Sequence, residues 1–158
     1  MKPIIFLYGA LAGTVIISTS ILTIALAGET HLAGAQWLGY LVMIVALSLI
    51  FVGIKRYRDQ ELGGVIRFGT GVLLGLGITL VASVIYVAAW EVYLAMTDYA
   101  FIDDYAQSML SSEEAADAAR RYANPAFRLP VTFLEIFPVG LLITLASAGL
   151  LKRGATAP

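Results

Sequence analysis

Four long apolar runs, separated by shorter polar segments, dominate the hydropathy pattern of the chain. They cover residues 3–27, 36–54, 68–96 and 129–151. A helix needs about 20 apolar residues to cross a bilayer core about 30 Å thick. The pattern therefore predicts a single integral membrane domain over residues 1–158, an all-α, four-transmembrane-helix bundle with antiparallel neighbours. The third run is longer than a bilayer requires, so we expect that helix to tilt or to project from the outer surface.

The amino-acid composition excludes a soluble protein. Of the 158 residues, 59% are hydrophobic and 13% are charged, whereas soluble domains are about 45–50% apolar and about 25% charged. A soluble fold of this length could not bury so much apolar surface. The net charge of −1 offers no basic face to a nucleic acid. The lipid bilayer is therefore a predicted partner, and nucleic acid is not.

The end of the first run, Ala25-Leu26-Ala27, resembles the cleavage site of a signal peptide. The apolar core of a signal peptide has only about 7–15 residues, and this run is longer. We therefore predict a retained span.

Lysine and arginine residues predict the orientation of the chain, because cytoplasmic loops carry an excess of them. They precede the first run, lie between the second and third, and follow the fourth: Lys2; Lys55, Arg56, Arg58 and Arg67; Lys152 and Arg153. The distribution predicts a multi-pass membrane protein with both termini in the cytoplasm. The four basic residues of the middle loop are interpreted as a cytoplasmic anchor or, alternatively, as a site for lipid headgroups. Gly63 and Gly64 allow the chain to turn into the third span.

Three strings of the sequence carry a resemblance to a known family: GIKRYRDQELGGVIRFGTG (residues 53–71), YVAAWE (86–91) and FLEIFPVGLL (133–142). With them the chain resembles, from Tyr8 to Lys152, the bacterial integral membrane family catalogued as domain of unknown function 4199. The resemblance implies a small four-helix membrane protein without an established activity. Together with the predicted orientation, it leads us to expect a protein of the bacterial inner (cytoplasmic) membrane. It transfers no catalytic residue.

Two carboxylates lie inside apolar runs, Glu91 in the third and Glu135 in the fourth. Ionisable groups in membrane spans usually face the bundle interior or water. Seven residues separate Glu91 from Asp98, and seven separate Arg128 from Glu135, so each pair shares one helix face. Because these spans are antiparallel, we predict that Asp98 pairs with Arg128 near the surface. Glu91 should then meet Glu135 about 10 Å deeper.

Two further residues of the fourth run are predicted to belong to this polar site. Thr132 lies between Arg128 and Glu135 on the same face. Pro138 cannot donate the hydrogen bond that the Leu134 carbonyl expects, which leaves a niche for water, a proton or a cation. The alternative interpretation is a structural polar cluster at the outer interface, since Glu91 lies about 36 Å along a straight helix from the basic Arg67.

Two glycine pairs at a spacing of four residues allow helix backbones to approach closely: Gly9 with Gly13, and Gly71 with Gly75. We predict that they pack spans within one chain, with a homodimer seam as the alternative. On a helical projection Gly71 and Gly75 fall opposite Glu91. We therefore expect the glycine face of the third span to contact one helix and Glu91 to face the fourth span.

The outer loop, residues 97–128, is predicted to contain a short extra helix. Ser111 and Glu114 form a capping box, alanines follow, and Pro125 ends the segment. Asp98, Asp103 and Asp104 lack the spacing of a calcium loop. A solvated cap without a metal site is therefore predicted.

The sequence contains no recognisable catalytic motif, such as a phosphate-binding loop, a nucleophile elbow or a metalloprotease helix. The absence of cysteine and the single His31 also exclude thiol chemistry and a two-histidine haem or zinc site. We therefore predict no catalytic residue and no cofactor, and favour an accessory or interaction subunit with a membrane protein partner or as a homodimer. The alternatives are a small proton- or cation-linked transporter or channel that uses Glu91 and Glu135, and a lipid-modifying enzyme.

Overall fold

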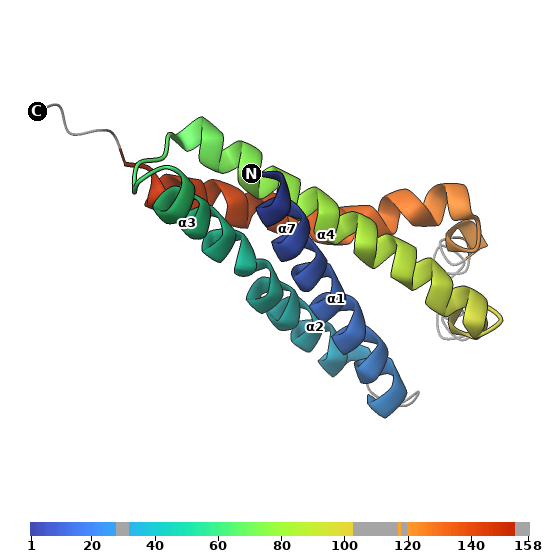
Figure 1. The fold of residues 1–158 in the computed structure, drawn as a ribbon. Coiled ribbons are helices and arrows are strands. Elements are labelled where there is room, and N and C mark those ends of the chain that lie inside the picture. Colours follow the sequence, from blue (N-terminus) through green and yellow to red (C-terminus); the bar gives the residue numbers. More distant parts are fainter. Residues whose placement is uncertain (28–31, 103–116, 118–119, 154–158) are drawn as a thin grey trace, which may run out of the picture.

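The chain is helical over almost all of the residues that the computed structural model describes, which are 1–27, 32–102, 117 and 120–153 (Figure 1). The helices are α1 (Lys2–Ala27), α2 (Leu32–Leu47), α3 (Leu49–Glu61), α4 (Phe68–Met96) and α7 (Pro125–Leu151). These described residues form no strand, and one isolated bridge joins Ile66 to Arg153. The predicted all-α fold is confirmed.

Four helical stretches are long and apolar enough to cross a membrane: Lys2–Ala25, Gly39–Glu61, Phe68–Met96 and Pro125–Leu151. Large apolar side chains also cover the outside of the bundle; Trp37 is 81% exposed and Leu150 is 78% exposed. Soluble monomers rarely expose extensive apolar surface of this kind. The helices therefore indicate a multi-pass membrane protein.

The helices form two antiparallel hairpins, α1 with α2–α3 and α4 with α7 (Figure 1). We call the end where α3 ends, α4 begins and α7 ends the basic end, and the opposite end the distal end. α4 packs along both α1 and α7. Toward the distal end the two hairpins diverge (Figure 1). The distal half of the bundle therefore has the shape of a fork.

The second span is longer than predicted and contains a break. α2 and α3 together replace the predicted run 36–54, and Ser48 separates them. The Ser48 hydroxyl donates a 2.6 Å hydrogen bond to the Val45 carbonyl. A serine side chain that bonds to the backbone in this way competes with the helix and commonly bends it.

The charged stop after the second span is helical up to Glu61, and a short turn follows. Three of the four basic residues predicted for the middle loop therefore lie near the end of α3: Lys55, Arg56 and Arg58. In the turn, Gly63 (φ 61°) and Gly64 (φ 90°) adopt left-handed backbone conformations. Glycine adopts them without steric penalty. The predicted glycine turn into α4 is confirmed.

Small residues bring α4 and α7 into close contact. A Cβ atom on Gly75 would lie 2.6 Å from Thr144 Cγ2, and a Cβ atom on Gly140 would overlap Thr79. The buried hydroxyls of Thr79 and Thr144 lie 3.3 Å apart and share a hydrogen bond. Each step of four residues along α4 is thus matched by a step of four residues back along α7.

Gly71 also faces α7, where its nearest neighbour is Ala148. The prediction that the glycine face and the Glu91 face of α4 contact different helices is therefore wrong. Contacts that repeat every four residues advance by about 40° at each step around a helix of 3.6 residues per turn. The two helices consequently wind around each other. Glu91, which lies opposite Gly71 on a straight projection, meets the same partner helix.

The other glycine pair places α1 against α4. A Cβ atom on Gly9 would lie 2.6 Å from Val81 Cβ, and one on Gly13 would lie 2.8 Å from the Ala82 carbonyl oxygen. Both glycine pairs thus lie at contacts between helices of the same chain.

The predicted loop helix lies mostly outside the described residues, as do Ser111, where it should begin, and Asp103, Asp104 and His31. The parts that are described, Asp117 and residues 120–122, are helical. After them, the Asn124 side chain accepts a hydrogen bond from the backbone of α7, which is the usual role of an N-cap residue. α7 therefore begins at Pro125, before the predicted residue 129.

Candidate functional site

An ion pair between Glu91 and Arg128 forms the polar centre of the α4–α7 seam near the distal end. Arg128 Nε donates to Glu91 Oε1 and Nη2 donates to Oε2, both at 2.7 Å. The Arg128 side chain is 1% exposed and that of Glu91 is 26% exposed. Two parallel charge-assisted hydrogen bonds give the strongest and most directional pairing of arginine with a carboxylate. The pair therefore fixes α7 relative to α4.

Arg128 occupies the first turn of α7, where a positive charge opposes the helix dipole. Its remaining hydrogen bonds offset the unfavourable interaction with the dipole. Nη1 donates to the carbonyl oxygens of Tyr122 (3.3 Å) and Ala123 (3.1 Å), just before the helix begins. One guanidinium thus joins α4, α7 and the segment that precedes α7.

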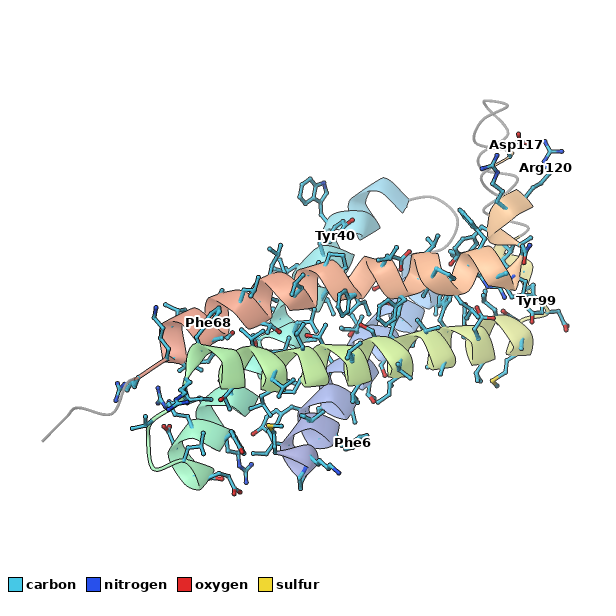
Figure 2. All side chains as sticks on the ribbon, turned by 90° about the horizontal axis from the view of Figure 1, so that it is seen from above. Phe6, Tyr40, Phe68, Tyr99, Asp117 and Arg120 are labelled. Carbon is cyan, nitrogen blue, oxygen red and sulfur yellow. The ribbon has the colours of Figure 1, made fainter. Side chains whose placement is uncertain are left out.

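Tyr99 lies beneath this guanidinium, and its ring centroid is 5.6 Å from Arg128 Cζ. Its φ angle of 60° is unusual for a bulky residue and normally indicates strain. Figure 2 shows Tyr99 at the end of α4, facing the start of α7. The left-handed turn at the end of α4 therefore presents an aromatic face to a buried cation, which is an attractive contact.

A chain of aromatic and hydroxyl groups extends this polar centre. Trp90 Nε1 donates a 3.1 Å hydrogen bond to the Tyr122 hydroxyl, and that hydroxyl lies 3.5 Å from Thr132 Oγ1. Burial raises the pKa of the Tyr122 phenol, and the nearby charge of Glu135 adds to this rise, although the hydrogen bonds from Thr132 and Trp90 oppose it. Thr132, predicted as part of the polar face, is buried in this network.

The predicted Asp98–Arg128 pair does not form. Asp98 follows the end of α4 with a φ angle of 49° and is exposed, while Arg128 points inward to Glu91. On a helix that continued past Met96 both acids would share a face, so helical spacing alone could not distinguish them. The four-residue register of the seam brings Glu91, and not Asp98, level with Arg128.

The predicted meeting of Glu91 and Glu135 is also wrong, because the two carboxylates face different surface grooves. Glu91 borders a groove with Ala88, Pro130 and Phe133. Glu135 is exposed and borders another groove, whose lining residues are Tyr40, Val131, Leu134, Pro138 and Val139. The shared carboxylate niche is therefore absent from the described structure.

Glu135 instead joins a polar group to which each of the four spans contributes one residue. Tyr40 of α2 lines the same groove and lies beside α7 in Figure 2. The Tyr86 hydroxyl of α4 faces both the Glu135 carboxylate and the Ser20 hydroxyl of α1. We call Ser20, Tyr40, Tyr86 and Glu135 the fork site, because they lie where the hairpins diverge. Sequence reasoning missed its hydroxyl groups, since only the register between spans shows that they share one level.

At the basic end, Arg58 connects α3 to the end of α7. Nη1 donates to the Leu151 carbonyl (3.5 Å) and Nε pairs with Asp59 Oδ1 (2.6 Å). A cation beside the last carbonyls of a helix is favourable. Arg58 is therefore mostly buried and bound within the chain, whereas the other predicted anchor residues are exposed: Lys55, Arg56 and Arg67.

The described residues contain no group of three or more histidine, cysteine, aspartate or glutamate side chains that could hold a metal ion. Of the predicted site residues, the structure brings together Glu91, Arg128 and, through Tyr122, Thr132. It leaves Asp98 at the surface and places Glu135 beside Pro138 in the fork.

Residues 7–153 match the family described as "Protein of unknown function (DUF4199)", and the chain belongs to this family. The match confirms the resemblance predicted from three strings of the sequence. Comparison with curated proteins and with solved structures found no match. Family membership therefore assigns no activity.

Proposed function

We propose that this member of the DUF4199 family is a non-enzymatic protein of the bacterial inner membrane that acts as an accessory or interaction subunit. The observation that carries the proposal is the ion pair of Glu91 with Arg128. A carboxylate that already accepts two 2.7 Å hydrogen bonds from a buried guanidinium is not free to bind a transported cation. The most buried charges of the bundle thus hold helices together.

The packing of the α4–α7 seam supports the same proposal. Contacts such as Gly75 with Thr144 bring the backbones so close that a single methyl group would not fit. The Thr79 and Thr144 hydroxyls form a hydrogen bond with each other, so they do not require a row of water molecules between the helices as hydrogen-bond partners. Such close packing between α4 and α7 suits a structural or binding role better than a route for ions through the bundle.

The distribution of basic residues supports an orientation with the basic end in the cytoplasm. Exposed Lys55, Arg56 and Arg67 would then lie at the cytoplasmic surface, beside anionic lipid headgroups. Cysteines introduced at exposed Glu61 and Arg120 should react with a membrane-impermeant reagent from opposite sides of sealed vesicles. Reaction of both from one side would contradict the orientation.

The accessory role is tested by extracting the chain from its own membranes in lipid nanodiscs after crosslinking. We expect one membrane protein to accompany it at a fixed ratio, and we expect the purified chain alone to leave a proton gradient across liposomes intact. A chain that is always recovered alone, and that dissipates the gradient by itself, would overturn the proposal.

A small cation-linked transporter is the second candidate, and Glu135 is the observation that favours it. Among the described residues, no lysine or arginine pairs with this carboxylate. The same liposome assay separates the two functions, because flux that is lost on Glu135→Gln would identify a transport site. Glu61→Gln, at the basic end, is the matched control for removal of one exposed acid.

A further inference from the structure

The fork site lies near the distal boundary of the hydrocarbon layer. Glu135 is 17 residues from Lys152, or about 25 Å along a helix, and Tyr40 is 15 residues from Lys55, or about 22 Å. If the basic residues mark one face of a bilayer core about 30 Å thick, the fork site lies just inside the opposite face. Exposed Trp37, one turn before Tyr40 on α2, is typical of residues at such an interface.

The groove at the fork presents hydrogen-bond acceptors that can accept more bonds than the one that the Tyr86 hydroxyl gives to Glu135. Glu135 is exposed there and has no cationic partner among the described residues. Pro138 lines the same groove with Leu134, and because proline has no N–H, the Leu134 carbonyl lacks its helical donor. The exposed ring of Tyr40 adds an aromatic face. A carboxylate, a free carbonyl and an aromatic ring together match a primary ammonium group, which carries one charge and three N–H donors.

We propose that the fork site binds the ammonium headgroup of an ethanolamine phospholipid in the distal leaflet. The ammonium bonds to Glu135 and the Leu134 carbonyl and contacts the Tyr40 ring. Apolar Val131 and Val139, which line the same groove, contact the upper part of an acyl chain. The site goes beyond the proposed accessory function and does not depend on it.

Charge complementarity favours a lipid over a second copy of this chain. Away from the basic end, the described spans contain one basic side chain, Arg128, and it is bound to Glu91. The spans of a second copy would therefore bring no free cation to Glu135, and its exposed Arg120 and Arg121 lie outside the spans, before α7. An ethanolamine headgroup supplies a cation at the right depth, and lipid already surrounds this face.

Trp37 provides the measurement, because it is 81% exposed beside the groove whereas the other tryptophan, Trp90, is 5% exposed. The purified chain is reconstituted in phosphatidylcholine with a minor fraction of lipid brominated in its acyl chains, which quenches tryptophan on contact. The brominated lipid carries an ethanolamine, a choline or a glycerol headgroup in turn. Quenching gives the association constant of each headgroup relative to choline.

We expect brominated phosphatidylethanolamine to associate about threefold more strongly than brominated phosphatidylcholine, because an ion pair at an exposed site typically strengthens binding by a factor of this size. Glu135→Gln should lower this ratio to about one, and Glu61→Gln should leave it unchanged. Quenching by brominated phosphatidylcholine should stay the same in each variant, which shows that the bundle is folded and Trp37 still meets lipid.

Three outcomes would overturn the proposal. An equal or greater preference for the glycerol headgroup would mean that Glu135 does not select an ammonium. Loss of the ethanolamine preference on addition of soluble phosphoethanolamine would mean that the groove takes free amines and not a lipid. Protection of Trp37 from all three brominated lipids in the crosslinked native complex would mean that a partner helix occupies the groove.

Discussion

Removing one partner of the Glu91–Arg128 pair should destabilise the bundle strongly, whereas replacing both should not. Glu91→Leu leaves a guanidinium that is 1% exposed without its carboxylate, and breaking a buried pair in this way costs about 3–5 kcal/mol. Because the Glu91 side chain is 26% exposed and water can reach it, we expect the lower end, about 3 kcal/mol. Arg128→Met should cost at least as much, because it also removes two hydrogen bonds to backbone carbonyls.

The double variant Glu91→Leu/Arg128→Met contains no unpaired charge. Its cost should fall short of the sum of the single costs by about 2 kcal/mol, which is within the usual range for residues in contact. The free energies of unfolding are measured in mixed micelles with a rising fraction of denaturing detergent, with helical circular dichroism as the signal. Asp98→Asn is the matched control: it removes the acid seven residues beyond Glu91, just after the end of α4, and keeps a residue type that tolerates φ 49°. It should change stability by less than about 0.5 kcal/mol.

Additive single and double costs would refute the reasoning, since they would mean that the two side chains do not interact. An Asp98→Asn variant as unstable as Glu91→Leu would also refute it. That result would restore the pairing of Asp98 with Arg128 that the helical spacing predicted.

Three other predictions use the same unfolding measurement or a simple titration. Gly75→Ala should lower the free energy of unfolding by about 1–3 kcal/mol, because its Cβ would lie 2.6 Å from Thr144 Cγ2. Adding Thr144→Ala should recover part of that stability. Gly69→Ala, with open space around it, should be neutral or slightly stabilising. Tyr99→Gly should be more stable than Tyr99→Ala by about 1 kcal/mol, because only glycine adopts a φ near 60° without strain. Burial raises the pKa of Tyr122, so the difference in absorbance titration between the wild type and Tyr122→Phe should show a phenol that ionises above the ordinary tyrosine range. The neutral Tyr122 phenol should contribute its full stabilisation of the fold at pH values below the ordinary tyrosine pKa. This contribution should be lost as the pH rises through the raised pKa of Tyr122 in the folded protein.

The sequence predicted the spans because their length and polarity are dictated by the bilayer itself. It also predicted the turn at Gly63 and Gly64, where a left-handed backbone requires glycine. It did not predict that the second span continues to Glu61, because charged residues can extend a helix beyond the lipid without any change in local propensity. The break at Ser48 was missed for a related reason: serine bends a helix only when its side chain bonds to the backbone.

The pairing of residues between spans failed because helical spacing gives the face of a residue and not its level relative to another helix. By their spacing Asp98 and Glu91 would share a face, so either could have met Arg128, but α4 ends at Met96 before it reaches Asp98. The missing signal was present in Gly140, a small residue in the middle of the fourth apolar run. Aligning Gly140 with Thr79 and stepping by four residues toward the distal end brings Arg128 level with Glu91, as the structure has it.

Both the small residues and the Glu91–Arg128 ion pair of the α4–α7 seam depend on this register. Small residues every four positions allow close packing, and a slip of four residues along the helix would bring Thr144 or Ile136 against Thr79, where even a Cβ atom on Gly140 would overlap. Such a slip would place the Arg128 guanidinium opposite Val87 or Ala95 in place of Glu91, and a buried charge without a partner is strongly disfavoured. The ion pair and the glycine–threonine contacts therefore specify the same register, and fixing a register is the best-supported role of buried charges in helical bundles. Glu135 takes no part in that selection because it faces outward into the fork, so its charge remains available to a ligand from the membrane.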